Sequence, residues 1–380
     1  MADVTKSLTR ALVILVLAAL YATPAAIAFI RQWEPEPIVT GPGVTRKTML
    51  SEYFSGIRGT PVDTEVYIFE GEEPGGTMFI IGSNHPVEPA GLLTQVLLVE
   101  NARVKQGRLI VIPRAMASGY TATEPGQGYP AGYEIKTDFG VRWFRYGMRN
   151  INPIHQFPDP DVFVNWSSGQ KLAGAESGNL NRNFPGRPNG RPSEKLAYAI
   201  MELIRKEKAD ISIDLHESPP CRPAVNSITA HQRGLDIGAY ATMLLEDDDI
   251  RIRIEVSPPN LRGLSHREWG DHSDTLAFLL ESCNPMHGPL HGPATVDLLL
   301  TAKDEVYEWA SDLGRTVIRH PSTGVPIAER VGRHVATIMA LATAWSDMNP
   351  DRAIVIEGMP TYEDLLKNGV GRYLLPVPGS

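Results

Sequence analysis

Short apolar runs alternate with amphipathic stretches along most of the chain. Residues 77–82 and 109–113 are continuous apolar runs of the length that buried strands have, and residues 89–104 between them have helical periodicity. The same pattern predicts further strands at 211–215, 250–256 and 275–280, and helices at 193–208, 235–246, 296–314 and 327–346. This alternation predicts a single α/β domain with a central mixed, mostly parallel sheet flanked by helices.

Two stretches interrupt the alternation. Residues 115–178 form a long insertion, rich in Gly, Pro and Asn, with little periodicity. Insertions of that length in compact domains often carry function. The Pro- and Gly-containing run 34–43 predicts a linker, so the folded domain is expected at 61–350, after a linker and lead-in at 31–60. Residues 351–380 are expected to form a C-terminal tail with one short strand.

The first 30 residues contain twenty consecutive uncharged positions, 11–30, which is enough to cross a bilayer as a helix. Lys6 and Arg10 precede them, Pro24 is expected to break the helix, and Ala26-Ile27-Ala28 fits a small-x-small cleavage site. These features favour a cleaved signal peptide over an uncleaved membrane anchor, with a buried helix as the third alternative. In the first two cases the domain is exported, to the periplasm or outside the cell.

The amino-acid composition excludes several classes of protein. Lys and Arg number 36 against 44 Asp and Glu, so the net charge is −8, and this acidic balance argues against a nucleic-acid partner. The chain is 42% hydrophobic and 21% charged, which excludes a disordered protein and a multi-span membrane protein. Cys221 and Cys283 are too few for a cysteine-rich metal site. Export would permit a disulfide between them, and two buried thiols are the alternative.

Polar side chains able to bind a metal follow three of the predicted strands. His85 and Glu88 follow the first, His216 the one at 211–215, and Glu281 the last. Because ligands of open α/β sheets bind at the carboxyl ends of strands, we expect these side chains to meet. Each of these residues on its own could have a purely structural role. The prediction of a metal site therefore rests on their occurring together at three strand ends. Three of them could hold zinc while Glu281 moves a proton; Glu217 competes for that role.

Two further segments could contact a substrate. The motif N-L-N-R-N-F-P-G at 179–186 holds Arg182 in a rigid turn, which suits bidentate capture of a carboxylate, although such an Arg can also brace a loop. The polar stretch 264–272 contains His266 and Arg267, which could face the substrate. A surface loop with internal ion pairs is the alternative for that stretch.

Taken in order, His85-x-x-Glu88, N-L-N-R-N-F-P-G, D-L-H-E at 214–217 and Glu281 resemble the succinylglutamate desuccinylase and aspartoacylase family, which are zinc hydrolases of the carboxypeptidase A clan. The resemblance covers about residues 64–342 and implies a zinc carboxypeptidase-like catalytic domain. It implies that one zinc ion is bound by His85, Glu88 and His216, that Asn181 and Arg182 hold a free substrate carboxylate, and that Glu281 is the general base and acid.

The chain departs from the family pattern at two positions. The family usually has Asp where this chain has Asn179, and that acid supports a zinc-bound His. The Arg expected to polarise the scissile carbonyl has no counterpart at Gly174, and Lys171 or Arg114 are the candidate replacements. The β-rich C-terminal domain of aspartoacylase is not expected either, because the last hundred residues have a helical pattern.

These residues predict a zinc-dependent amide hydrolase that removes an acyl group from an N-acyl amino acid or a related small amine. A metallocarboxypeptidase acting on peptide or cell-wall C-termini would use the same metal and base, so the motifs do not separate the two. A catalytically inactive, membrane-tethered binding protein is a third hypothesis, favoured by Asn179. The expected partner is a small acylated amine or short peptide, and the membrane is involved only through residues 11–30, if these are retained.

Overall fold

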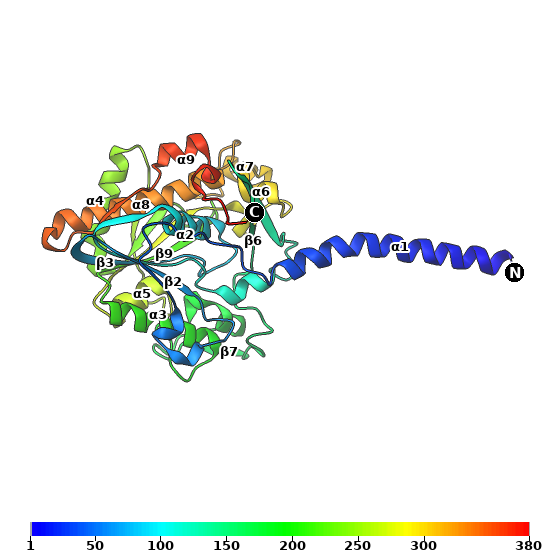
Figure 1. The fold of residues 1–380 in the computed structure, drawn as a ribbon, viewed down its shortest axis with the longest axis horizontal. Helices are drawn as coiled ribbons and strands as arrows, with labels where there is room; N and C mark the ends of the chain where they lie inside the picture. Colours follow the sequence, from blue (N-terminus) through cyan, green and yellow to red (C-terminus); the bar gives the residue numbers. More distant parts are fainter. Residues whose placement is uncertain (1, 380) are drawn as a thin grey trace.

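The computed structural model describes residues 2–379 and contains a long N-terminal helix that projects from an α/β body (Figure 1). Eight strands of the central sheet follow the order β1-β2-β4-β3-β9-β12-β10-β11, and β13 pairs with β4. The central strands β4, β3, β9 and β12 run parallel, and the outer pairs β1–β2, β2–β4, β12–β10 and β4–β13 are antiparallel, so the predicted mixed sheet is confirmed. The strands are β1 (Arg46–Met49), β2 (Glu65–Glu70), β3 (Glu73–Ile81), β4 (Arg103–Ile112), β9 (Ile211–Ser218), β10 (Ser227–Ala230), β11 (Arg253–Val256), β12 (Leu276–Cys283) and β13 (Val355–Glu357).

Helices cover both faces of this sheet, and the alternation of side chains along each strand decides which residues meet which helices. Met78 and Ile80 of β3 belong to the core that contains α2, α4 and α8. Phe79 and Ile81 belong to the core on the other face, which α3 and α5 cover. Figure 1 shows the two helix layers on opposite sides of the strands. The helices are α1 (Ala2–Arg31), α2 (Pro89–Asn101), α3 (Pro192–Glu207), α4 (Leu235–Asp247), α5 (Ser265–His272), α6 (Val296–Thr301), α7 (Glu305–Asp312), α8 (Ile327–Met348) and α9 (Tyr362–Asn368).

Most predicted elements are present. The strands β1, β2 and β10 were not predicted, and two further stretches differ from the prediction. The helix expected at 296–314 is divided, because Ala302 adopts a left-handed conformation that ends α6 and Asp304 caps α7. The stretch around His266 forms α5, which sequence periodicity did not predict. The two cysteines form no disulfide: Cys283 is a buried thiol, and the thiol of Cys221 lies 3.5 Å from the hydroxyl of Tyr307.

The N-terminal helix differs from the expected pattern at its proline. α1 continues through Pro24, so the predicted break at that residue is wrong. Residues Val4–Arg31 have a mean hydropathy of 2.4 in their most apolar window, and none of that window is buried in the body. One such helix near the N-terminus is compatible with a signal sequence or with a membrane anchor.

The segments predicted as linker and tail pack against the body. Glu36, within the predicted linker, is buried and forms ion pairs with Arg114 (3.2 Å) and Arg145 (2.6 Å). β1 lies within the predicted lead-in, and β13 lies within the predicted tail. Both segments therefore contribute strands to the sheet.

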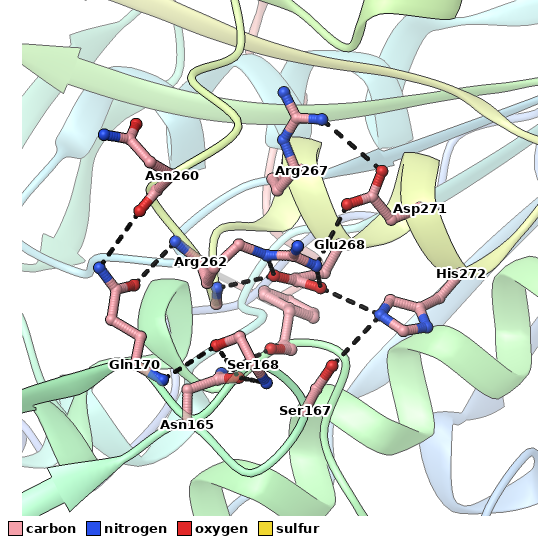
Figure 2. A network of polar contacts seen from close by, with 12 residues as sticks. Asn165, Ser167, Ser168, Gln170, Asn260, Arg262, Arg267, Glu268, Asp271 and His272 are labelled. Atoms are coloured by element: carbon pink, nitrogen blue, oxygen red, sulfur yellow. Dashed lines mark hydrogen bonds and ion pairs between the residues drawn. The ribbon is translucent and has the colours of Figure 1, made fainter.

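The insertion 115–178 contains two small hairpins, β5 (Gly132–Thr137) with β6 (Gly140–Arg145) and β7 (Val162–Val164) with β8 (Lys171–Ala173). Figure 2 shows how its last part is tied to α5 by polar contacts. The buried carboxylate of Glu268 accepts two hydrogen bonds from Arg262, both of 2.7 Å, and Gln170 of the insertion accepts from the Arg262 N–H. His272 lies 3.1 Å from the same carboxylate. The internal ion pairs considered for this stretch are therefore present, but they belong to a largely buried helix and not to a surface loop.

A fully buried ion pair joins α8 to the strands behind the site. Arg330 Nη1 lies 2.8 Å from Glu217 Oε1, and neither side chain is exposed. The other carboxylate oxygen of Glu217 accepts from the N–H of Ala90 (3.0 Å) at the start of α2. Glu217 therefore connects β9, α2 and α8.

Replacing Arg330 by Met is expected to lower the free energy of unfolding by about 3–5 kcal/mol, because the Glu217 carboxylate would stay buried without its counter-ion. Chemical denaturation of the purified protein measures this. The matched control is Arg58→Met in the exposed Arg58–Glu52 pair, for which a change of about 0–1 kcal/mol is expected. A loss no larger than that of the control would contradict the prediction, and Arg330→Met/Glu217→Gln should recover part of the stability.

Candidate metal centre

A tight turn after β3 places His85 and Glu88 at the edge of the sheet. Residues 82–88 connect the end of β3 to the first residue of α2. Ser83 has a φ of +57°, which is uncommon for a residue other than glycine, and its hydroxyl donates to the carbonyl of Pro113 (2.8 Å). The N–H of Glu88 donates to the carbonyl of His85 (3.0 Å). This bond closes the turn that brings the two side chains together.

The other side chains come from two neighbouring parallel strands. Asp214 and His216 are two residues apart on β9, so they point to the same face of the sheet, where the hydroxyl of Ser265 in α5 donates to Asp214. Glu281 on β12 is in register with His216. Paired residues on neighbouring strands share a face, and Glu281 therefore projects beside His216.

His85, Glu88 and His216 form a buried triad in which the candidate ligand atoms all lie within 4.8 Å of one another. His85 Nδ1 is 2.8 Å from Glu88 Oε1, and His216 Nδ1 is 2.9 Å from Glu88 Oε2. The two imidazole rings have centroids 4.6 Å apart. The three residues predicted as ligands are thus brought together.

Each histidine of the triad is oriented through its outer ring nitrogen. His216 Nε2 lies 2.9 Å from Asp214 Oδ2, and His85 Nε2 lies 2.9 Å from the amide oxygen of Asn179. Asn179 therefore keeps an acceptor where the family has Asp. Two Nδ1 atoms and one carboxylate, with their outer nitrogens held by oxygen acceptors, are a donor set that fits a catalytic zinc ion.

Burial and charge set the protonation of the triad. Burial lowers the pKa of His85 to about 3, so this ring is held neutral, which is the form that binds a metal. Burial alone would raise the pKa of Glu88, but the two histidines outweigh it and hold that pKa well below the usual range. Burial also opposes the charged form of His216, but Asp214 and Glu88 raise its pKa well above the ordinary value. The triad therefore contains an ionised carboxylate beside a neutral ring.

Glu281 is a second carboxylate beside the triad. Burial raises the pKa of Glu281 to about 8, although the charges of His216 and Arg149 act against this. Its Oε2 is buried and has no hydrogen-bond partner among residues 2–379. Glu217, the competing carboxylate, is bound to Arg330 and to the N-terminus of α2, so it is not available as a base.

Two residues of the site were not predicted. His287, in the turn after β12, has Nε2 3.2 Å from Glu88 Oε1, and Arg149 Nη1 is 2.9 Å from the same ring nitrogen. The position of His287 after a strand, like that of His216, was a signal that could have identified it. Arg149 lies in the aperiodic insertion, where no sequence pattern indicates a direction.

The predicted substrate residues lie close to the triad, and they differ in how many hydrogen-bond partners they already have. Asn181 Nδ2 is 3.5 Å from His216 Nε2, and its amide oxygen accepts from the Ser265 N–H (2.8 Å). Arg182 donates to the carbonyl of Asn181 (2.7 Å) and lies 3.6 Å from Glu176. His266 is buried, and neither ring nitrogen has a partner among the described residues. Burial first, then the neighbouring His216, lowers the pKa of His266 to about 3.

The two cations considered as replacements for the missing Arg lie elsewhere. Arg114 is buried, and its guanidinium is paired with the carboxylates of Glu36 and Glu65. Lys171 is exposed on β8, where it pairs with Val164 of β7, and its side chain forms no hydrogen bond or ion pair with residues 2–379. The guanidinium next to the triad is that of Arg149.

No family model matches the chain, and no curated protein matches it. Solved structures do resemble it. A succinylglutamate desuccinylase from Silicibacter sp. TM1040 is 17% identical, with a TM-score of 0.38, over 60% of this chain and 55% of that one. The apo cell shape determinant protein Csd4 from Helicobacter pylori is 11% identical, with a TM-score of 0.46, over 80% and 59% of the two chains.

A metallo-carboxypeptidase from Burkholderia cenocepacia is 12% identical, with a TM-score of 0.43, over 81% of this chain and 66% of that one. This chain thus spans little more than half of the desuccinylase structure. The solved structures that resemble this chain include members of the family that the motifs indicated, at low sequence identity. All three TM-scores lie below 0.5, and the function proposed below rests on the geometry of the site itself.

Proposed function

We propose that the protein is a zinc-dependent hydrolase that cleaves an amide bond and removes an acyl group from an N-acyl amino acid or a related small amine. The observation that carries this proposal is the buried triad of His85, Glu88 and His216 with Glu281 in register beside it. A zinc ion in such a site lowers the pKa of a water molecule and polarises a carbonyl group. The chain's own residues would supply the remaining functions.

Glu281 is suited to the proton transfer. As a base it would take a proton from the attacking water, and as an acid it would give that proton to the leaving amine. A raised pKa serves both steps, because the carboxyl then exchanges its proton near neutral pH. The unpartnered Oε2 leaves an oxygen of this carboxyl available to the reacting atoms.

Two arginines would divide the recognition of the substrate. Arg149, which contacts His287 beside the triad, would stabilise the charge that develops on the carbonyl oxygen. Arg182, near Asn181, would bind the free carboxylate of the substrate. The Glu176 carboxylate lies 3.6 Å from the Arg182 guanidinium, which is a long distance for an ion pair. In a chain of net charge −8 these local cations would have to attract an acidic substrate.

The purified protein is expected to contain about one zinc ion per chain, measured by elemental analysis, and a chelator should abolish hydrolysis until zinc is returned. His216→Ala should lose the metal, because one of three ligands is gone. The control is His320→Gln, a buried histidine outside the triad that binds the carbonyl of Ala302. N-acyl amino acids should be cleaved. Cleavage of peptides alone would identify a carboxypeptidase, and ligand binding without metal or turnover would identify a binding protein.

Glu281→Gln is expected to lower kcat by about 10²–10⁴-fold with the zinc content unchanged, because the amide cannot accept the proton. In the wild type, kcat/KM should fall as the pH drops through the pKa of Glu281, since only the ionised carboxyl acts as a base. The burial-raised value places this limb at or below pH 8, because a bound cation lowers the pKa of a nearby carboxyl. A Gln variant with full activity would exclude Glu281 as the base.

Arg149→Met is expected to lower kcat by about 10²–10³-fold with a small change in KM, because it removes charge stabilisation made in the transition state. Arg182→Met should mainly raise KM, since the carboxylate contact exists before and during the reaction. Steady-state kinetics of both variants measure this difference, and Lys171→Met, which alters an exposed side chain, is the control. If Lys171→Met lowered kcat and Arg149→Met did not, the assignment of the two cations would be reversed.

A further inference from the structure

The chain that leaves α1 is fixed to the body from its first residue. The side chain of Gln32 is fully buried, and its amide donates to the carbonyls of Ala131 (3.0 Å) and Tyr146 (2.9 Å). Four residues later the Glu36 carboxylate binds Arg145 (2.6 Å) and Arg114 (3.2 Å). α1 ends at Arg31, so no free residue separates the helix from these contacts. The direction of α1 relative to the body is therefore set by buried hydrogen bonds.

Apolar side chains are exposed around the point where α1 joins the body. We define the root face as Trp33, Phe139 and Val141, whose exposed fractions are 52%, 68% and 56%. Phe139 is in the turn between β5 and β6, and Figure 1 shows β6 beside the inner end of α1. Phe139 and Val141 line one groove with Arg31 and Trp143, and the Arg31 guanidinium lies 4.1 Å from the centre of the Trp143 ring.

Exposed apolar residues occur on most proteins, so exposure alone does not indicate a binding surface. The position of these three residues is what suggests one. They border the last turn of a helix that is long and apolar enough to cross a membrane. Trp and Arg side chains at the end of a span typically lie at the level of the lipid headgroups, where an aromatic ring has both apolar and polar surroundings. No flexible residues separate α1 from the body. The root face therefore lies in the same environment as the C-terminal end of α1.

We propose that the root face rests in the headgroup region of the membrane that α1 crosses, so that the folded domain is held against the bilayer in one orientation. This inference goes beyond the hydrolase activity and requires that α1 is retained. It also brings the chain segment that contacts the candidate metal centre close to the membrane. The carbonyl of Tyr146 accepts a hydrogen bond from Gln32, and the side chain of Arg149 contacts His287. The backbone positions of Tyr146 and Arg149 are at most about 11 Å apart, because only three residues separate them. Substrates would therefore reach the site close to the bilayer surface.

The test uses the full chain reconstituted in phosphatidylcholine and phosphatidylglycerol vesicles. Phe139→Cys in a Cys221→Ser background is labelled with an environment-sensitive fluorophore, and Cys283 stays buried. The matched control is Met243→Cys in the same background, at a 62% exposed position on α4, which Figure 1 places at the end of the body away from α1. At position 139 we expect a blue-shifted emission and strong quenching by headgroup-labelled spin lipids, and neither effect at position 243.

Equal quenching at the two positions would overturn the proposal. A blue shift that appears in detergent without vesicles and grows with protein concentration would also overturn it, because a second copy would then cover the face. Intact mass measurement of the purified chain provides the remaining check. A chain that begins after Ala28 would lack the anchor and exclude the proposal, whatever its hydrolase activity.

Discussion

The carboxylate of Glu88 is the group on which the arrangement of the site depends. It lies between the two imidazoles at 2.8 and 2.9 Å, and its Oε2 also accepts from the N–H of Glu217 (3.1 Å). A buried carboxylate is costly unless opposite charge and hydrogen bonds compensate. Here the cationic His216 and the backbone of β9 do so, and the start of α2 adds the partial positive charge of a helix N-terminus. A metal ion would provide stronger compensation at the same place.

A second buried carboxylate, that of Glu217, connects the site to the surrounding helices. Glu217 holds the first turn of α2 and is neutralised by Arg330 of α8. The turn that carries His85 and Glu88 is therefore attached to the helix layer that packs on one face of the sheet. On the other face, α5 binds Asp214 through Ser265, and Asp214 orients His216. The backbone turn that carries His85 is thus attached to one helix layer, and His216 is oriented from the other.

Sequence patterns predicted the four central parallel strands and the long helices, but they missed β2 and β10, which are also buried. Apolar runs marked the central strands because strands covered on both faces contain few polar residues, and the polar residue that ended each run marked the site. His287 follows a predicted strand and was overlooked. Arg149 and α5 were not predicted because their positions depend on tertiary contacts and not on periodicity. The same holds for the run 34–43. Its Pro and Gly indicate a linker locally, but Glu36 is fixed by Arg114 and Arg145 from two distant segments.

The insertion 115–178 connects these observations. Its first hairpin contributes Phe139 and Val141 to the root face, and its Arg145 and Tyr146 hold the chain that leaves α1. The N–H of Gly147 then bonds to the carbonyl of Pro86 in the turn that carries the candidate ligands, and Arg149 follows at His287. One continuous stretch of chain therefore contacts the root of α1 and the metal centre in succession. A long aperiodic segment in such a place has a structural function, because the polar contacts of residues 145–149 fix both the start of the chain after α1 and the cation beside His287.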